Sequence, residues 1–283
     1  MTASLLLTGI ELTDAYHDAI LTKRPGFAWL EIESEPYIEQ NDNLLNRLDQ
    51  IRQHYPISMH GTGLSLGSAD DLNWQHLKQL KELAARIEPC LISGPLAWSS
   101  INGHYLHELL PLPYTDESLE HLISRIHQVQ EYLGRPILLE NIASFIRYTH
   151  STIPENEFLN KIAEKTGCGI LLNITHLYIN AMNFKFNPVT YLTHLPTRHV
   201  QEIHVSGFSS TTIHEKDVLL DTKDHSIVPA VWELFCAAVR QLGKKPTIIE
   251  WNKKIPPLDT LYLEAFRAEK ILRETYVTAK STG

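Results

Sequence analysis

Residues 115–141 read TDESLEHLISRIHQVQEYLGRPILLEN, and this stretch contains one complete helix-turn-strand unit. Apolar residues recur at spacings of three and four from Leu119 to Leu133, which is typical of a helix with one buried face. Gly134 ends the helix, and the apolar run 136–140 that follows has the length of a buried strand. This order of elements predicts a parallel sheet covered by helices.

The same order recurs along the whole chain, with amphipathic segments such as Leu77–Ile87 between the strands. We expect strands at eight places: 5–10, 27–33, 56–60, 90–94, 136–140, 169–174, 200–205 and 246–251. Eight strand-helix units predict an α/β fold with a single (β/α)₈ TIM barrel. No linker rich in Gly, Ser or Pro divides the chain of 283 residues, so we expect one domain over 1–283. Residues 258–275 are expected to form the eighth helix, and 276–283 a flexible tail.

Local signals mark the ends of several of these helices. Thr115 is expected to cap the helix that begins there, and Asn156 the helix that includes Phe158. Besides Gly134, two further glycines, Gly167 and Gly243, stand just before expected strands. We therefore expect these helices to end at glycine residues.

Composition excludes several classes of function. The formal charge is −8 and 43% of residues are hydrophobic, so the chain can bury a core but lacks the basic surface that nucleic acid requires. No apolar run is long enough for a membrane span, and the N-terminus lacks a signal peptide, so we expect a cytoplasmic protein. The three cysteines are widely spaced and suit neither disulfides nor a zinc knuckle.

Polar residues stand where the expected strands end, and in an eight-stranded barrel these ends converge on one open mouth. The candidate residues at these ends are His60, Glu140, Asn141, Asn173, His176, His204 and Glu250. A carboxylate at the end of an apolar strand costs several kcal/mol unless a cation or metal compensates it. We therefore expect a metal site; the alternative is a structural network of hydrogen bonds and ion pairs. Oxygen and nitrogen donors favour iron, manganese or zinc.

A second polar group follows the seventh expected strand. It contains Asp221, Lys223 and His225, of which Asp221 and His225 could reach the mouth, although such a loop is equally often a solvated surface. Trp98 and Tyr105 could line a pocket above the barrel, although aromatic residues at these spacings more often serve packing.

The motifs of this chain resemble those of the multinuclear non-haem iron-dependent oxidases, formerly a family of unknown function, over nearly the whole length. They are WLEIESEPY (29–37), SMHGTGLSLGS (58–68), PLAWSSINGHYLHELLPLPYT (95–115), LLENIASF (138–145), TGCGILLNITHLYINA (166–181), VQEIHVSG (200–207), LLDTKDHSIV (219–228) and IIEWN (248–252). The resemblance implies a xylose-isomerase-like barrel that holds two or three irons. It also implies oxygen-dependent modification of cysteine or other residues in a ribosomally made precursor peptide, as in methanobactin biosynthesis, often with a partner protein that presents the peptide.

The resemblance also assigns individual residues to the metal site. The positions that match the family's metal-binding or site-lining groups are His60, Glu140, His204, Asp221, His225 and Glu250.

Four departures from the family pattern all fall on the polar mouth. Gly94-Pro95 stands where relatives have Glu-His, and Asn173 stands where they have an aspartate. Lys223 replaces a histidine of the Asp-x-His-Asp-His motif, and Phe208 replaces another histidine. A charged lysine has no lone pair to offer a metal.

The retained residues predict a reduced site with one or two irons rather than three, or another divalent metal such as manganese or zinc. The predicted ligands are His60, Glu140, His204 and Glu250, with Asn173 and Asp221 in addition. Residues expected to line the site are Asn141, His176, Lys223, His225, Trp98 and Tyr105. Three functions remain open: an iron-dependent oxidase that modifies a peptide, a catalytically silent scaffold that binds a peptide or partner, and a metal-dependent sugar isomerase or hydrolase.

Overall fold

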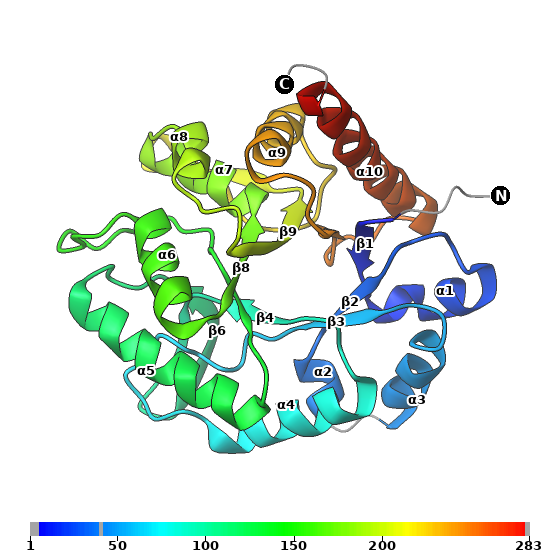
Figure 1. Cartoon of the computed structure of the whole chain (residues 1–283), viewed down its shortest axis with the longest axis horizontal. Coiled ribbons are helices and arrows are strands. Elements are labelled where there is room, and N and C mark those ends of the chain that lie inside the picture. Colours follow the sequence, from blue (N-terminus) through cyan, green and yellow to red (C-terminus); the bar gives the residue numbers. More distant parts are fainter. Residues whose placement is uncertain (1–5, 40–41, 281–283) are drawn as a thin grey trace.

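Eight parallel strands form a closed barrel in the computed structural model, which describes residues 6–39 and 42–280 (Figure 1). The strands are β1 (Thr8–Glu11), β2 (Leu30–Glu33), β3 (Ile57–His60), β4 (Ile92–Pro95), β7 (Leu138–Glu140), β8 (Gly169–Asn173), β9 (Val200–Ser206) and β12 (Thr247–Glu250). Around the barrel they follow the order β1, β12, β9, β8, β7, β4, β3, β2. Each of the eight expected strands has its counterpart here, so the predicted (β/α)₈ barrel is confirmed.

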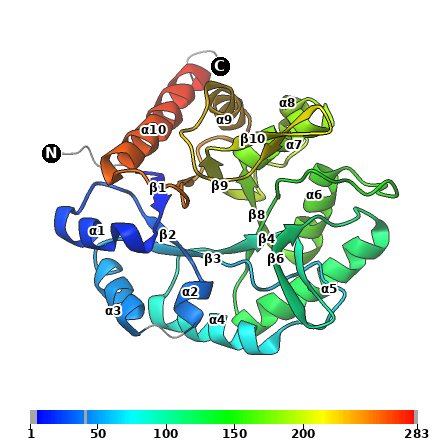
Figure 2. The same cartoon turned by 180° about the vertical axis from the view of Figure 1, so that it is seen from behind.

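Helices surround the barrel in both views (Figures 1 and 2). They are α1 (His17–Lys23), α2 (Glu35–Ile38), α3 (Asp42–Ile51), α4 (Trp74–Ile87), α5 (Asp116–Leu133), α6 (Glu155–Thr166), α7 (Ile174–Phe184), α8 (Pro188–Thr193), α9 (Pro229–Leu242) and α10 (Leu258–Lys280), with a 3₁₀ turn at Asp14–Tyr16. Their apolar faces are buried against the strands; in α4, for example, Leu77, Leu80 and Leu83 are buried. Within the described residues, no helix combines the length and apolar character that crossing a membrane requires.

The helix ends follow the expected signals with one exception. The side chain of Thr115 accepts a hydrogen bond from the Ser118 backbone N–H and caps α5, as predicted. Gly134 and Gly167 end α5 and α6 in the left-handed region, with φ of 74° and 72°. The expected cap at Asn156 is wrong, because α6 begins two residues earlier, after Pro154, whose fixed φ suits the start of a helix.

The last helix continues further than expected. It runs to Lys280, whereas we expected it to end at residue 275 and a flexible tail to start at residue 276. Residues 276–280 contain neither glycine nor proline, so nothing in this sequence ends the helix. The remainder of the expected tail, 281–283, lies outside the described residues.

Two hairpins extend from the mouth of the barrel, and the sequence analysis did not predict either of them. β5 (Trp98–Ile101) pairs with β6 (His104–Leu110), and β10 (Ser209–Ile213) pairs with β11 (Lys216–Leu220), both antiparallel. Each has two turn residues with positive φ, Asn102-Gly103 and His214-Glu215, as two-residue hairpin loops require. The hairpins follow β4 and β9 and so lie at the C-terminal side of the barrel, where β6 and β10 are visible in Figure 2.

Candidate metal centre

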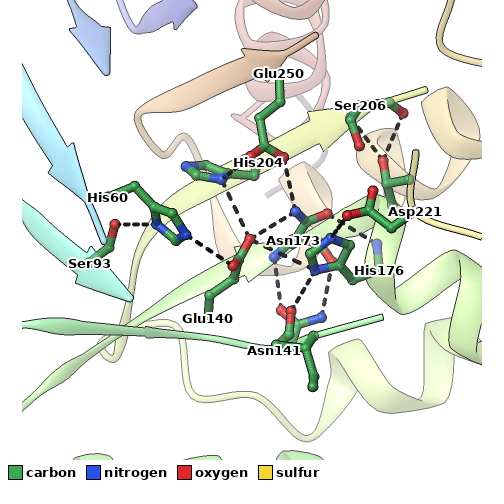
Figure 3. Close-up of polar contacts among 12 residues, drawn as sticks. His60, Ser93, Glu140, Asn141, Asn173, His176, His204, Ser206, Asp221 and Glu250 are labelled. Atoms are coloured by element: carbon green, nitrogen blue, oxygen red, sulfur yellow. Dashed lines mark hydrogen bonds and ion pairs between the residues drawn. The ribbon is translucent and has the colours of Figure 1, made fainter. Parts of the chain in front are cut away.

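The strands bring four of the predicted ligands together in the barrel (Figure 3). His60, Glu140 and Glu250 are the last residues of β3, β7 and β12. His204 lies within β9, and its side chain is fully buried. Because parallel strands all end on the same side of a barrel, side chains from distant parts of the sequence meet there.

Glu140, His204 and Glu250 each offer one ligand atom, and these three atoms lie within 4.8 Å of one another. His204 Nδ1 is 3.6 Å from Glu140 Oε1 and 3.2 Å from Glu250 Oε1. This nitrogen is buried and, among the described residues, makes no hydrogen bond. A metal ion between the three side chains would satisfy it, and one imidazole with two carboxylates is a donor set that suits iron, manganese or zinc. The residues therefore fit a metal ion.

His60 extends this group on the side of β3. Its Nε2 lies 3.5 Å from Glu140 Oε2, and its Nδ1 lies 2.8 Å from the hydroxyl of Ser93 on β4. Ser93 donates its own hydrogen to the Met59 carbonyl at 3.4 Å, so the hydroxyl can accept a hydrogen from Nδ1. This arrangement leaves Nε2 directed at Glu140, in the orientation that a metal ligand needs.

Asn173 is placed as a hydrogen-bond bridge and not as a ligand. Its Nδ2 donates to Glu140 Oε1 at 2.9 Å and to Glu250 Oε2 at 3.1 Å. Its Oδ1 accepts the backbone N–H of His176 at 3.0 Å and so caps α7. The cap requires oxygen at one end and the carboxylates require N–H at the other, which fixes the orientation of the amide. In this orientation Asn173 presents to the site a donor, which cannot bind a metal.

His176 forms an ion pair with Asp221 at the edge of the group. Its Nε2 lies 3.0 Å from Asp221 Oδ2, and its Nδ1 lies 2.8 Å from the Asn141 carbonyl. Both partners accept hydrogen, so both ring nitrogens carry one and the ring is a cation. Burial alone would lower the pKa of His176, but Asp221 and Glu140 outweigh it and raise the pKa to about 9.

Lys223 places an ammonium group on one of the predicted ligands. Its Nζ lies 2.7 Å from Glu250 Oε1, and its side chain is 17% exposed. Burial disfavours the charged form, but Glu250 and Asp221 more than compensate and hold the pKa of Lys223 well above its usual value. Both oxygens of Glu250 thus have a donor, Lys223 on one and Asn173 on the other.

The charges of this group stabilise one another. Burial would raise the pKa of Glu140, but His60 and His176 lower it; for Glu250, Lys223 and His204 have the same effect. His204 is held protonated in the same way, because Glu31 and Glu250 outweigh its burial and raise its pKa well above the usual value. In the absence of a metal, the cationic side chains replace the charge that a metal would supply.

Two buried glutamates lie deeper in the barrel, and neither was among the residues predicted from the sequence. Glu31 Oε1 and Glu202 Oε1 lie 3.0 and 3.4 Å from His204 Nε2, and the three side chains form a second group whose ligand atoms are within 4.8 Å. Ser58 donates to the other oxygen of Glu31 at 2.9 Å. Desolvation, and then the charge of Glu31, raise the pKa of Glu202 to about 8. The available signal was a charged residue inside a buried strand, two residues before His204 and therefore on the same face.

The remaining predicted residues lie at the periphery of this group. Asn141 exchanges hydrogen bonds with the backbone of Asn173, donating to its carbonyl at 3.1 Å and accepting its N–H at 2.8 Å. His225 pairs with Asp224, and its side chain is 51% exposed. Trp98 donates to the Pro111 carbonyl at 2.9 Å, and Tyr105 on β6 is 41% exposed. The structure thus places Asn141 in the wall of the site, and His225, Trp98 and Tyr105 in the surrounding loops.

Comparison with solved structures supports the class of fold. The chain is similar to the 3-keto-D-glucoside 4-epimerase YcjR from E. coli, with a TM-score of 0.57, 16% sequence identity and coverage of 94% of this chain and 99% of that one. It is also similar to the D-psicose 3-epimerase of Clostridium cellulolyticum H10, with a TM-score of 0.58, 12% identity and coverage of 95% and 98%. Fold and site together define a xylose-isomerase-like TIM barrel whose buried His and Glu side chains are consistent with metal binding.

Sequence comparison identifies the family. A family model described as RiPP precursor modification enzyme MbnB/TglH/ChrH matches residues 7–273. UPF0276 proteins of Vibrio vulnificus strain YJ016 and Acaryochloris marina are 42% and 43% identical to this chain over 265 and 264 residues. These matches cover 94% and 93% of this chain, and 91% and 94% of those proteins. The chain therefore belongs to this family of enzymes that modify precursors of ribosomally made peptides, which implies a peptide substrate.

Proposed function

We propose that this chain is an iron-dependent oxidase that modifies cysteine or other residues of a ribosomally made precursor peptide. The observation that carries the proposal is the convergence of Glu140, His204 and Glu250, whose ligand atoms lie within 4.8 Å of one another in a buried site. His60 lies beside them, and its Nε2, 3.5 Å from Glu140 Oε2, could serve as a fourth ligand atom. The family supplies the substrate class, and a partner protein that presents the peptide belongs to the same proposal.

One metal ion suits this site better than two or three. Lys223 and Asn173 each donate to one oxygen of Glu250, at 2.7 and 3.1 Å, so a Glu250 that binds one ion has little remaining capacity to bridge to a second. Asp221, which could serve a second ion, is paired with His176. Fixed cations thus take the place of further metal charge.

The residues around the ion would have distinct roles. A bound iron would supply the one-electron chemistry with oxygen that no side chain provides. Glu140, His204 and Glu250 would hold the ion, and Asn173 would orient the two carboxylates by donating a hydrogen bond to each. His176 holds a proton at Nε2 against Asp221, whose side chain is 23% exposed. The surrounding buried side chains exclude water from this region.

Metal analysis of protein purified without oxygen tests the proposal. We expect about one iron per chain after addition of Fe(II), and a loss of most of it in Glu140→Gln. Glu157→Gln is the matched control, because Glu157 lies on α6 and pairs at the surface with Lys161. Less than about 0.3 metal per chain in the native protein, with no gain on adding Fe(II), would refute the metal site. A site that retains manganese or zinc but not iron would refute the assignment of iron.

The engagement of Glu250 favours a second candidate, a metal-free family member that binds a peptide without modifying it. Lys223, Asn173 and His204 satisfy the carboxylates without an ion. This candidate predicts that the protein binds the precursor peptide but takes up no metal. The metal analysis after addition of Fe(II) therefore separates the two functions.

A further inference from the structure

A cavity of about 1000 Å³ lies beside the metal centre, between the loop 141–154 and helices α6, α7 and α8. These helices are neighbours on one side of the barrel in both views (Figures 1 and 2). Its lining includes Tyr114, Ile142, Arg147, Phe184, Phe186 and Tyr191. None of them belongs to the metal centre, and a cavity of this size accommodates several peptide residues.

The cavity and the metal centre share two elements. Ile142 lines the cavity and follows Glu140 by two residues, which limits the distance between their Cα atoms to about 7 Å. Asn180 also lines the cavity and lies about one helical turn after His176 on α7. Its side chain donates to the Ile142 carbonyl and accepts the Ser144 N–H, both at 2.8 Å. Short segments of β7 and its loop, and of α7, therefore connect the two sites.

The cavity wall combines aromatic rings with a cation. The guanidinium carbon of Arg147 lies 4.0 Å from the ring centre of Phe184 and 5.4 Å from that of Phe186. Arg147 forms no ion pair with any residue that the structure describes, although its charge acts at longer range on the buried Glu155. A guanidinium held on aromatic faces is well oriented to receive a carboxylate, since its edge remains free.

Two tyrosines of the cavity wall surround a buried carboxylate, Glu155. The side chain of Tyr191 is 7% exposed, and its hydroxyl oxygen is buried close to Glu155. Burial, and then the charge of nearby Glu155, raise its pKa well above the usual value, so the hydroxyl keeps its hydrogen. Tyr114 donates to Glu155 Oε1 at 2.8 Å. Both tyrosine hydroxyls thus lie against the buried Glu155, behind the cavity wall, and the aromatic rings are what Tyr114 and Tyr191 contribute to the cavity.

We propose that this cavity binds an aromatic side chain of the substrate peptide, while Arg147 pairs with the carboxylate of an adjacent acidic residue of the same peptide. The proposal rests on the proposed function for the nature of the substrate. The Cα atom of Ile142 in the cavity wall lies within about 7 Å of that of Glu140. The aromatic residue bound in the cavity is therefore only a few peptide residues from the one at the metal centre. The aromatic wall and unpaired cation select this occupant over a purely apolar one.

Calorimetric titration of the metal-free full chain with short peptides tests the proposal. The probes are N-acetylated, C-amidated Gly-Phe-Asp-Gly and its counterparts with Ala in place of Phe or Asn in place of Asp. We expect each replacement to weaken binding by about tenfold. Arg147→Gln should remove the preference for Asp over Asn, and Thr190→Trp, at an exposed position lining the cavity, should weaken all three peptides. Arg198→Gln is the control, because Arg198 is exposed and pairs with Glu164 outside the cavity.

The outcomes separate this proposal from the proposed function. The titration needs no metal or turnover, so a chain that binds no iron can still show the peptide preference. Equally, a chain that binds iron can lack the peptide preference. Equal affinity for the three peptides would overturn the proposal, as would binding that Arg147→Gln and Thr190→Trp both leave unchanged in folded protein. Binding of free phenylalanine without binding of the capped peptide would also overturn it, since the ligand would then be an amino acid.

Discussion

Asn173 shows how one amide changes the electrostatics of the site. An aspartate at this position would place a third carboxylate within hydrogen-bond distance of Glu140 and Glu250. The amide instead donates to both of them and still caps α7 through its oxygen. Together with Lys223 it makes the metal-free site electrostatically acceptable, which is a condition for this barrel to fold before it binds metal.

Replacing Lys223 by methionine removes the cation but keeps much of the side-chain volume. We expect the metal-free protein to lose about 3–5 kcal/mol of unfolding free energy, because Glu250 remains buried without its partner. Urea unfolding measures this loss. Lys254→Met is the matched control, since Lys254 pairs with Asp224 but is 68% exposed, and should change stability by at most about 1 kcal/mol. Equal effects of the two substitutions would contradict the role of Lys223.

The ion pair of His176 predicts a pH dependence. The pKa of His176 is raised from 6.5 to about 9 in the folded protein, so its contribution to stability is complete below pH 6.5 and is lost as the pH rises towards 9. This shift corresponds to roughly 3 kcal/mol. We expect the unfolding free energy of metal-free protein to fall across this range, and to fall less in His176→Gln. A slope that the substitution leaves unchanged, as we expect for exposed His127→Gln, would contradict the assignment.

The position of a residue in its strand decided whether it could be recognised from the sequence as part of the site. His60, Glu140 and Glu250 were found because they end strands, a position that the sequence shows directly. Glu31 and Glu202 were missed because they lie inside apolar strands, and only residues at the ends of strands were considered as candidates. Asn173 and Lys223 were found, but their hydrogen bonds to the carboxylates depend on side-chain directions that only the closed barrel defines.

At the scale of elements, apolar periodicity predicted the strands and helices well, because each is buried on a defined face. The hairpins β5–β6 and β10–β11 were missed because they project from the barrel and bury few residues, so their sequences lack a strong apolar pattern. The end of α10 was misplaced for a different reason: a flexible tail was inferred from small polar residues, which do not by themselves end a helix.

The glycine that ends α5 provides a test at this scale. Gly134 has φ of 74°, and no atom lies within 4 Å of the position that a Cβ would take. The substitution Gly134→Ala therefore meets only the backbone cost of the left-handed region, about 1 kcal/mol of unfolding free energy. Urea unfolding should show this loss, whereas Glu131→Ala on the exposed face of α5 should have little effect. A neutral Gly134→Ala would mean that the end of the helix rearranges freely.

At the scale of the whole molecule, the barrel unites residues that are far apart in the chain. The three central candidate ligands, Glu140, His204 and Glu250, come from β7, β9 and β12, and Glu31 comes from β2. We propose that residues 1–283 form a single domain, because the closed barrel takes its strands from residues 8 to 250. A ligand set distributed in this way exists only when the barrel is closed, so metal binding and global folding are coupled.

This coupling predicts that metal stabilises the entire barrel and not just its mouth. An ion that binds the folded chain alone adds about 2.7 kcal/mol to the unfolding free energy at a free concentration of 100 times Kd. We expect Fe(II), added without oxygen, to raise the midpoint of urea unfolding by the same amount whether helix content or tryptophan fluorescence is followed, because helices and strands unfold together. Glu140→Gln should abolish this gain while Glu157→Gln, at a surface ion pair, preserves it. A gain seen by one probe only would show that the ion orders the loops without stabilising the barrel, and a gain retained in Glu140→Gln would place the ion elsewhere in the molecule.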